Sequence, residues 1–117
     1  MRQALRTLRG IVRSLQLYYG DGERRAAMDL LYGRFVKSGD LVFDIGAHVG
    51  DRVAAFRRLG ARVVAVEPQP ALVKTLKLLY GRDRGVIIEP PAVITQIINT
   101  IIERLAQRTN AAMGQAP

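Results

Sequence analysis

The sequence predicts an α/β fold in which helices flank a three-stranded parallel sheet. Two short apolar runs, Leu41–Ile45 and Arg62–Val66, have the length and composition of strands that are buried on both faces. Residues 51–59 between them are predicted to be helical, because an acidic residue begins this stretch and two arginines stand near its end. A further helical stretch and a third apolar run, 86–88, follow. Strands that alternate with helices in this way are typical of a parallel sheet.

Composition limits the classes of protein to which the chain can belong. Its 117 residues suit one compact domain. It has no cysteine and one histidine, which argues against a disulfide framework and against a cysteine- or histidine-rich metal site. No apolar run approaches the ~20 residues of a membrane span, and arginines interrupt the N-terminal region where a signal peptide would be apolar. A cytoplasmic protein is therefore expected.

The chain is strongly basic, with 18 Lys and Arg against 10 Asp and Glu and a net charge of +8. Such a balance is compatible with nucleic-acid binding. The basic residues are spread along the whole chain, however, and they do not alternate with aromatic residues that could stack on bases. We therefore expect no nucleic-acid partner, while an anionic substrate or membrane surface remains an open alternative.

Residues 1–36 are predicted to form an N-terminal helical segment. In residues 1–19, apolar side chains recur at helical spacing and four arginines occupy other faces. This helix is expected to pack across the domain as a lid or support, and the alternative is a basic helix that lies on an acidic membrane surface. Residues 20–22 predict a turn, and residues 23–35 predict a second helix. The repeating apolar positions of the first helix are Leu5, Leu8, Val12, Leu15 and Tyr19.

Residues 37–93 hold the candidate binding site. Gly46 and Gly50 lie in the turn after the first strand, and Glu67 ends the second strand. Because ligands of an open parallel sheet bind outside the carboxyl ends of its strands, these residues are expected to share one site. The glycines let a ligand approach the backbone, and the Glu67 carboxylate can accept hydrogen bonds from both hydroxyls of a ribose. The pattern indicates an adenosine-type ligand.

Two kinds of adenosine ligand compete for this unit. The dinucleotide pattern G-x-G-x-x-G, started at Gly46, requires glycine where His48 and Asp51 stand. Started two residues earlier, it requires glycine in place of Asp44 and Val49. The two aspartates would also place negative charge close to a pyrophosphate. S-adenosylmethionine (SAM) has an ammonium group, a sulfonium and no phosphate, so it tolerates acidic neighbours.

The run VFDIGAHVGDRVAAFRRLGARVVAVEPQPALVKTLK resembles the first two motifs of SAM-dependent methyltransferases. More narrowly, it resembles the FkbM family, in which D-I-G-A-x-x-G followed by V-x-x-x-E-P is characteristic. The resemblance covers residues 33–93. It implies a Rossmann-like half-domain with strand order 3-2-1, and methyl transfer to a hydroxyl oxygen of a sugar or another small molecule.

The same resemblance implies SAM as the cofactor and a set of residues that would contact it. These residues are Asp44, Gly46, Ala47, His48, Gly50, Glu67, Pro68 and Ala92. No catalytic base is identified. His48, the single histidine, is expected to form a local hydrogen bond in the turn rather than to act as a base.

A proline in the first turn opens a predicted helix at 70–80, where the missing proline N–H costs nothing. A polar turn leads to the third strand, 86–88, which ends at Pro90 and Pro91 because two successive prolines cannot continue a central strand. By the methyltransferase resemblance this strand tip lies near the adenine, and Ala92 and Val93 are the candidate contacts there.

Residues 94–117 are predicted to form a divergent C-terminal segment. The helix in this segment is expected to pack on the sheet, and the alternative is an oligomerisation helix with an exposed apolar seam. Residues 110–117 are small and polar, and a disordered tail is expected there. Six apolar residues share one helical face: Ile94, Ile97, Ile98, Ile101, Ile102 and Leu105.

No fourth strand is predicted after residue 88, although the methyltransferase sheet continues beyond three strands. The first strand is apolar and lacks the charges that guard a sheet edge, so it would favour association if left unpaired. We expect that another chain or a helix covers this edge, or that the sequence is a fragment cut or frameshifted near residue 93. A truncated FkbM-type methyltransferase is the favoured hypothesis. The alternative is a non-catalytic cofactor-binding remnant, or a module that self-associates through the first strand or the C-terminal helix.

Overall fold

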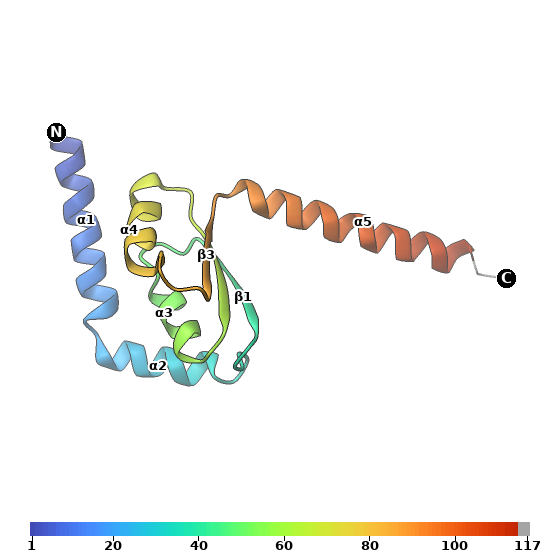
Figure 1. Cartoon of the computed structure of the whole chain (residues 1–117), viewed down its shortest axis with the longest axis horizontal. Coiled ribbons are helices and arrows are strands. Elements are labelled where there is room, and N and C mark those ends of the chain that lie inside the picture. The colour runs from blue at the N-terminus through green and yellow to red at the C-terminus, as the bar shows by residue number, and fades with distance from the viewer. Residues whose placement is uncertain (115–117) are drawn as a thin grey trace.

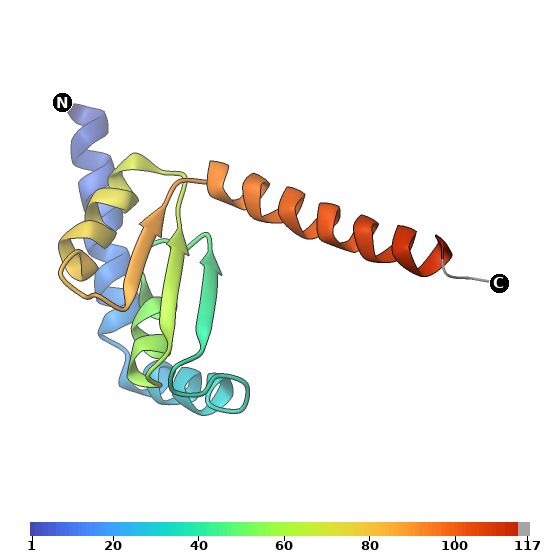
Figure 2. The ribbon, with the colours of Figure 1, turned by 45° about the vertical axis from the view of Figure 1, so that its right-hand side comes forward.

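The computed structural model describes residues 1–114 and has an α/β fold with one open, three-stranded parallel sheet (Figure 1). The strands are β1 (Leu41–Ile45), β2 (Arg62–Val66) and β3 (Val86–Glu89). Their order across the sheet is β1-β2-β3, which is the expected 3-2-1 order read from the other edge. Both pairs of strands are parallel, so the carboxyl ends of all three strands lie at the same end of the sheet (Figure 2).

The helices of the described residues are α1 (Arg2–Tyr19), α2 (Gly22–Tyr32), α3 (Asp51–Arg58), α4 (Pro70–Tyr80) and α5 (Ala92–Gly114). The side chain of Asp21 caps α2 by accepting a hydrogen bond from the Arg24 amide at 3.0 Å. Gly60 follows α3 with φ of +84°, the left-handed conformation that glycine adopts most readily after a helix. The predicted second helix extended to residue 35, whereas α2 ends at Tyr32 and a turn follows.

The core lies between one face of the sheet and helices α3 and α4. Alternate strand residues point toward these helices, as in the parallel row that joins Val42, Val63 and Val86. The strands and the connections to them bury their small and β-branched side chains against the two helices. The buried cluster consists of Ala47, Val53, Phe56, Ala61, Val63, Ala65 and Leu76.

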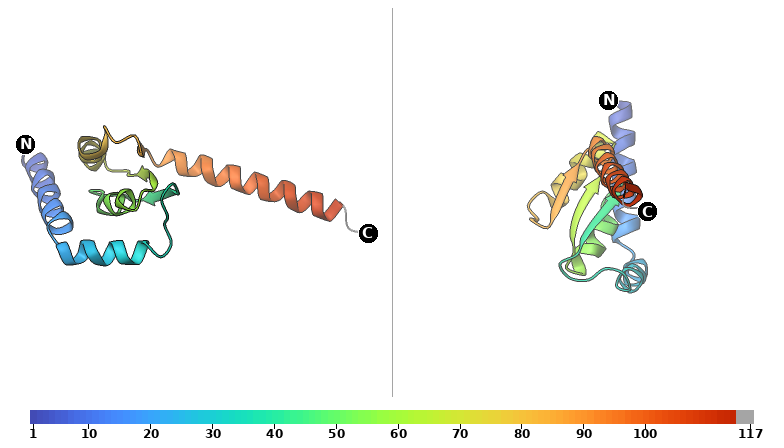
Figure 3. Two further views of the ribbon diagram at one scale, coloured as in Figure 1. Left: turned by 60° about the horizontal axis from the view of Figure 1, so that its bottom comes forward. Right: turned by 90° about the vertical axis from the view of Figure 1, so that its right-hand side faces the viewer.

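In the described part of the chain, no helix covers the opposite face of the sheet (Figure 3, right). Three residues of β1 point to this face: Leu41, Phe43 and Ile45, whose exposed fractions are 50%, 44% and 55%. The expectation that the first strand is buried on both faces is therefore wrong. The reason is that helices α1 to α4 all lie on the other side of the sheet (Figure 1).

Helix α5 extends away from the sheet, and no residue from Ala92 to Gly114 is buried (Figures 1 and 2). The expectation that this helix packs on its own sheet is therefore wrong. Residues 110–114 continue the helix, which corrects the prediction of a disordered tail there, and residues 115–117 lie outside the described range. Because of α5 the molecule is elongated, with principal extents of 65 × 36 × 22 Å.

Helix α1 touches the domain along a face that differs from the predicted one. Its half-buried residues are Ile11, Ser14, Leu15 and Tyr18. Of the predicted apolar stripe, Leu5, Leu8 and Val12 are exposed. None of the helices within residues 1–114 has both the length and the apolar character needed to span a membrane.

Candidate functional site

The turn between β1 and α3 is held against the end of β2 by backbone hydrogen bonds. The amides of Gly46 and Ala47 both donate to the carbonyl of Val66, at 2.8 and 3.0 Å. Within the described residues, His48 is the single non-glycine residue with positive φ, at 54°. Such a conformation is uncommon for a residue with a side chain and is maintained here by the surrounding contacts.

Glu67 joins this turn to the tip of β2. Its carboxylate is 4% exposed, and Oε2 accepts a hydrogen bond from the His48 amide at 2.9 Å. Oε1 accepts one from the Gln69 amide at 3.0 Å. The side chain thus points into the turn, where a ribose-binding carboxylate is expected. Each oxygen retains a second lone pair, but the burial of the side chain keeps these lone pairs from solvent.

Asp44, at the end of β1, is 4% exposed and forms an ion pair with Arg52 from α3. Arg52 Nε donates to Asp44 Oδ1 at 2.8 Å, and its Nη2 donates to the Gly46 carbonyl at 2.9 Å. Among residues 1–114, Asp44 Oδ2 is the single fully buried side-chain oxygen or nitrogen without a hydrogen-bond partner. Burial raises the pKa of Asp44, and the Arg52 contact opposes this shift without cancelling it.

Three carboxylates are buried around the turn. Besides Asp44 and Glu67, Asp51 at the start of α3 is 8% exposed and pairs with Arg24 at 3.0 Å. Asp44 and Asp51 are each paired with one guanidinium group, whereas Glu67 accepts from two backbone amides. A pyrophosphate would meet unfavourable charge here, whereas a cationic ligand would be stabilised.

The two glycines of the turn have different surroundings. A Cβ at Gly46, which has φ of +75°, would meet no atom within 4 Å, so its backbone is open to a ligand. A Cβ at Gly50 would lie 2.7 Å from the Tyr80 ring and 2.8 Å from Leu76. The surroundings of Gly50 therefore give it a packing role, whereas the space beside the Gly46 Cα is open.

Two tyrosines from outside the predicted motifs bind the same turn. The Tyr19 hydroxyl of α1 donates to the Val49 carbonyl at 2.8 Å, and the Tyr80 hydroxyl of α4 donates to the Gly50 carbonyl at 3.0 Å. Burial and contact between the two hydroxyls raise the pKa of Tyr19. Sequence periodicity placed Tyr19 on an apolar helix face and gave no signal for the hydroxyl of either tyrosine.

The remaining expected contacts divide between buried and open positions. Ala47 is completely buried, whereas Pro68 and Ala92 are exposed at the carboxyl ends of β2 and β3. The His48 ring lies edge-on to Tyr18 of α1, with centroids 5.9 Å apart. The structure therefore brings together Asp44, the 46–50 turn and Glu67. Ala92 is separated from them, because it follows β3, which lies at the other side of the sheet from β1.

A hollow of about 280 Å³ lies between α1, the turn and the start of α4. His48 and Gln69 form one side of it, and their amides are the ones that hold Glu67. Its other lining residues are Thr7, Gly10, Ile11, Ser14, Ala71 and Leu72. The volume is close to the lower end of the range for small-ligand pockets, about 300 Å³. The hollow thus borders both residues whose amides bind Glu67.

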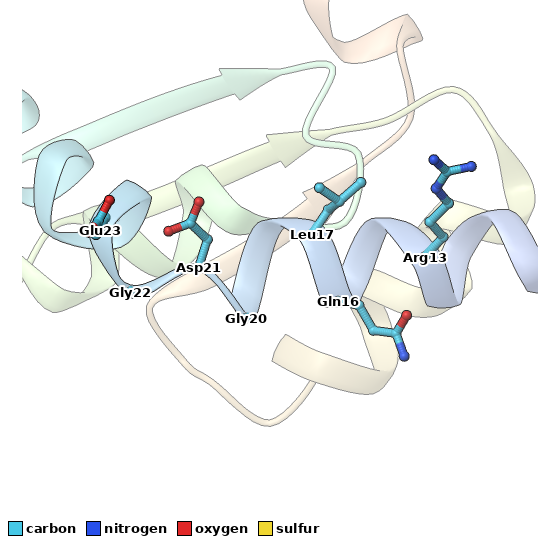
Figure 4. A pocket seen from close by; sticks show the side chains of 7 residues that line it. All are labelled: Arg13, Gln16, Leu17, Gly20, Asp21, Gly22 and Glu23. Carbon is cyan, nitrogen blue, oxygen red and sulfur yellow. The ribbon is translucent and has the colours of Figure 1, made fainter.

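A larger hollow of about 730 Å³ occupies the elbow between α1 and α2 (Figure 4). Residues 13–23 supply its whole lining, and none of the expected cofactor contacts is among them. No group of three or more potential metal ligands occurs within residues 1–114. The combination of Asp44, the open backbone at Gly46 and Glu67 is therefore the candidate site.

Comparisons with known proteins add no assignment to this geometry. The chain matches no family model, no curated protein and no solved structure.

Proposed function

We propose that this chain binds S-adenosylmethionine at the carboxyl edge of its sheet, as the cofactor-binding half of an FkbM-type methyltransferase. The observation that carries the proposal is the buried Asp44 oxygen without a partner, close to Gly46, where the space that a Cβ would occupy is open. An unpaired buried acceptor is costly, and a ligand ammonium group could satisfy it.

The charge of the site supports this ligand over a nucleotide with phosphates. Asp44, Asp51 and Glu67 are all buried carboxylates, and the glycine pattern of a dinucleotide site is missing from the turn. When bound, SAM supplies a methyl group on a positively charged sulfur. In the proposed complex Asp44 holds the ammonium end, Gly46 admits the ligand to the backbone, and Glu67 accepts from the ribose.

Glu67 requires a local rearrangement in this proposal. Its oxygens now accept from the amides of His48 and Gln69. Both residues border the hollow under α1, so a small shift of the turn would expose the carboxylate toward that space. Ligand binding should therefore change the environment of the His48 ring and of its neighbour Tyr18.

Methyl transfer to a hydroxyl oxygen is the proposed reaction. The main contribution of the protein to such an in-line displacement is to position the two reactants. No base is assigned, and His48 faces Tyr18 in a turn that is held by its own backbone. The alternative is a module that binds the cofactor without transferring its methyl group. A transfer assay with radiolabelled SAM and sugar acceptors distinguishes these two functions.

Titration calorimetry with SAM tests the binding proposal. We expect measurable heat with the unmodified chain, and at least about tenfold weaker binding by the Asp44→Asn variant, because a charge-assisted hydrogen bond is lost. The same variant should be more stable at neutral pH. Burial raises the pKa of Asp44, so ionisation of this side chain destabilises the folded state as the pH rises through its pKa.

Asp83→Asn is the matched control, because Asp83 precedes β3 at the other edge of the sheet and pairs with Arg57. It should leave SAM affinity unchanged. Absence of heat at high micromolar SAM, or equal affinity of the Asp44→Asn variant and the unmodified chain, would contradict the proposal. Stronger binding of NAD than of SAM would identify a dinucleotide site instead.

A further inference from the structure

The uncovered face of the sheet presents large apolar side chains to solvent. One parallel row joins Phe43, Val64 and Ile87, and Leu41 and Ile45 extend the same face along β1. Leu41, Phe43, Ile45 and Ile87 are each between 44% and 55% exposed. A contiguous apolar surface of this kind is uncommon on a monomer and marks an interaction site.

Helix α5 presents a second unpartnered apolar surface in the same chain. Ile98, Ile101, Ile102 and Leu105 are 48% to 57% exposed along one side of it. Its isoleucines and threonines have modest helix propensity, and helices in proteins are stabilised mainly by packing of an apolar face. A partner for this face is therefore needed to stabilise the helix.

The connection to α5 keeps this helix away from its own sheet. Only Pro90 and Pro91 lie between the end of β3 at Glu89 and the start of α5 at Ala92. Each proline fixes its own φ and restricts the residue before it to extended conformations. The backbone of residues 89–91 is therefore restricted, and a reversal of chain direction there is unfavourable. The carbonyls of both prolines also accept the first hydrogen bonds of the helix, from Val93 and Ile94.

The exposed area exceeds that of a compact monomer. The chain exposes 8783 Å². A compact protein of this mass exposes about 6,300 Å². The excess of roughly 2,500 Å² per chain is larger than the ~1,200–2,000 Å² that stable interfaces bury in total. The radius of gyration is likewise 18.3 Å, against the ~13 Å of a compact domain of this length.

We propose that α5 of one chain packs on the uncovered sheet face of a second copy, and that the exchange is reciprocal. The apolar side of α5 from Ile94 to Leu105 rises about 17 Å, which matches the length of a five-residue strand. The net charge of α5 is only +1, from one glutamate and two arginines, so the helix adds little to the repulsion between two chains of net charge +8. Both apolar surfaces are thereby buried, in the manner of domain-swapped dimers.

The absence of cysteine from the chain allows a direct test by disulfide cross-linking. One batch of protein carries Phe43→Cys on the sheet, and a second carries Ile101→Cys on α5. When the two are mixed under mild oxidation, the predominant product should be a disulfide-linked pair of unlike chains. Lys77→Cys, on the exposed side of α4, is the matched control and should give little product with either.

Light scattering on the unmodified chain should give twice the 12.9 kDa mass of one chain at micromolar concentration. Ile101→Glu should weaken the association at least tenfold, whereas Gln107→Glu on the opposite side of α5 should not. Circular dichroism checks that both variants retain their α/β content.

Other outcomes would overturn the proposal. A monomer mass would exclude a dimer, and cross-linking of Ile101→Cys chains with one another would indicate pairing of α5 with α5. Cross-linking of Phe43→Cys chains with one another would indicate sheet-to-sheet packing. A monomeric chain that carries both cysteines and closes an internal disulfide would show that α5 folds back on its own sheet.

Discussion

A methyl group at Gly50 would lie 2.7 Å from the Tyr80 ring and 2.8 Å from Leu76, whereas one at Gly46 would meet no atom within 4 Å. Both residues have φ near +80°. A side chain at either position costs about 1–2 kcal/mol of backbone strain. Only Gly50 adds an overpacking cost, which is typically about 1–3 kcal/mol.

We therefore expect Gly50→Ala to lower the free energy of unfolding by about 3 kcal/mol and Gly46→Ala by about 1 kcal/mol. Urea unfolding measured by circular dichroism gives both values. Gly10→Ala, in the exposed part of α1, is the control and should not destabilise the chain. Equal losses at the two turn glycines would show that Tyr80 and Leu76 move aside without cost.

At the same scale, sequence reasoning predicted that Asp44 and Glu67 lie at neighbouring strand ends but not how their side chains are bonded. Asp44 and Glu67 were expected at neighbouring strand tips because parallel strands end at one edge, and both lie there. The engagement of Glu67 by the His48 and Gln69 amides depends on the exact path of two turns, which residue types do not determine. The position of Arg52 across Asp44 and Gly46 likewise has no sequence signal.

At the scale of elements, α1 is attached to the domain through its second half. Tyr19 donates to the Val49 carbonyl, and Tyr18 packs against His48. The first half of the helix leaves Leu5 and Leu8 exposed. The Tyr19 hydroxyl therefore links the basic helix directly to the glycine turn.

Tyr19→Phe removes this hydroxyl and retains the ring. We expect a loss of about 1 kcal/mol of stability, since a part-buried hydrogen bond disappears and the Val49 carbonyl loses its donor. Hydrogen exchange of the α1 amides should become faster, while the amides of β2 should keep their relative protection. Leu17→Ala on an exposed face of α1 is the matched control and should change neither stability nor exchange in β2. Unaltered exchange of α1 in the Tyr19→Phe variant would show that other contacts hold the helix.

The elements themselves could be predicted to different degrees from the sequence. Strands β1 and β2 and helices α3 and α4 were predicted within a residue, because glycines and prolines mark their ends and apolar runs mark the strands. The packing of α1 and α5 could not be predicted, because an amphipathic pattern shows that a helix has an apolar side but not which surface receives it. The burial of β1 was wrong for the same reason, since a run of apolar residues does not reveal that one face of the sheet lacks helices.

At the scale of the whole molecule, two ion pairs connect α3 to distant segments. Arg58 bonds Asp29 of α2, and Arg57 forms a two-pronged pair with Asp83 before β3. These hydrogen bonds lower the pKa of both aspartates. A carboxyl with a lowered pKa stabilises the fold above its ordinary pKa of about 4, and that contribution is lost as the pH falls through the lower value in the folded state.

We therefore expect thermal stability to decrease as the pH is lowered below about 4, because both aspartates then become protonated. Asp44 acts in the opposite direction, because burial raises its pKa and protonation favours the folded state. A double variant, Asp29→Asn with Asp83→Asn, should start less stable at neutral pH and show a flatter decrease in acid. Calorimetric melting curves at several pH values measure this difference.

Net charge provides the competing explanation for acid sensitivity. The chain already carries +8 at neutral pH, and protonation of its carboxylates would increase self-repulsion. Added salt screens that repulsion over about 10 Å at 0.1 M, whereas the close Arg57–Asp83 and Arg58–Asp29 pairs are screened less. If the ion pairs dominate, moderate salt should restore little of the stability lost in acid, and the double variant should respond to salt as the unmodified chain does. Two results would assign the acid sensitivity to overall charge instead of to these two pairs. The first is that added salt fully restores the stability of both proteins in acid, and the second is that their stabilities fall in parallel with pH when no salt is added.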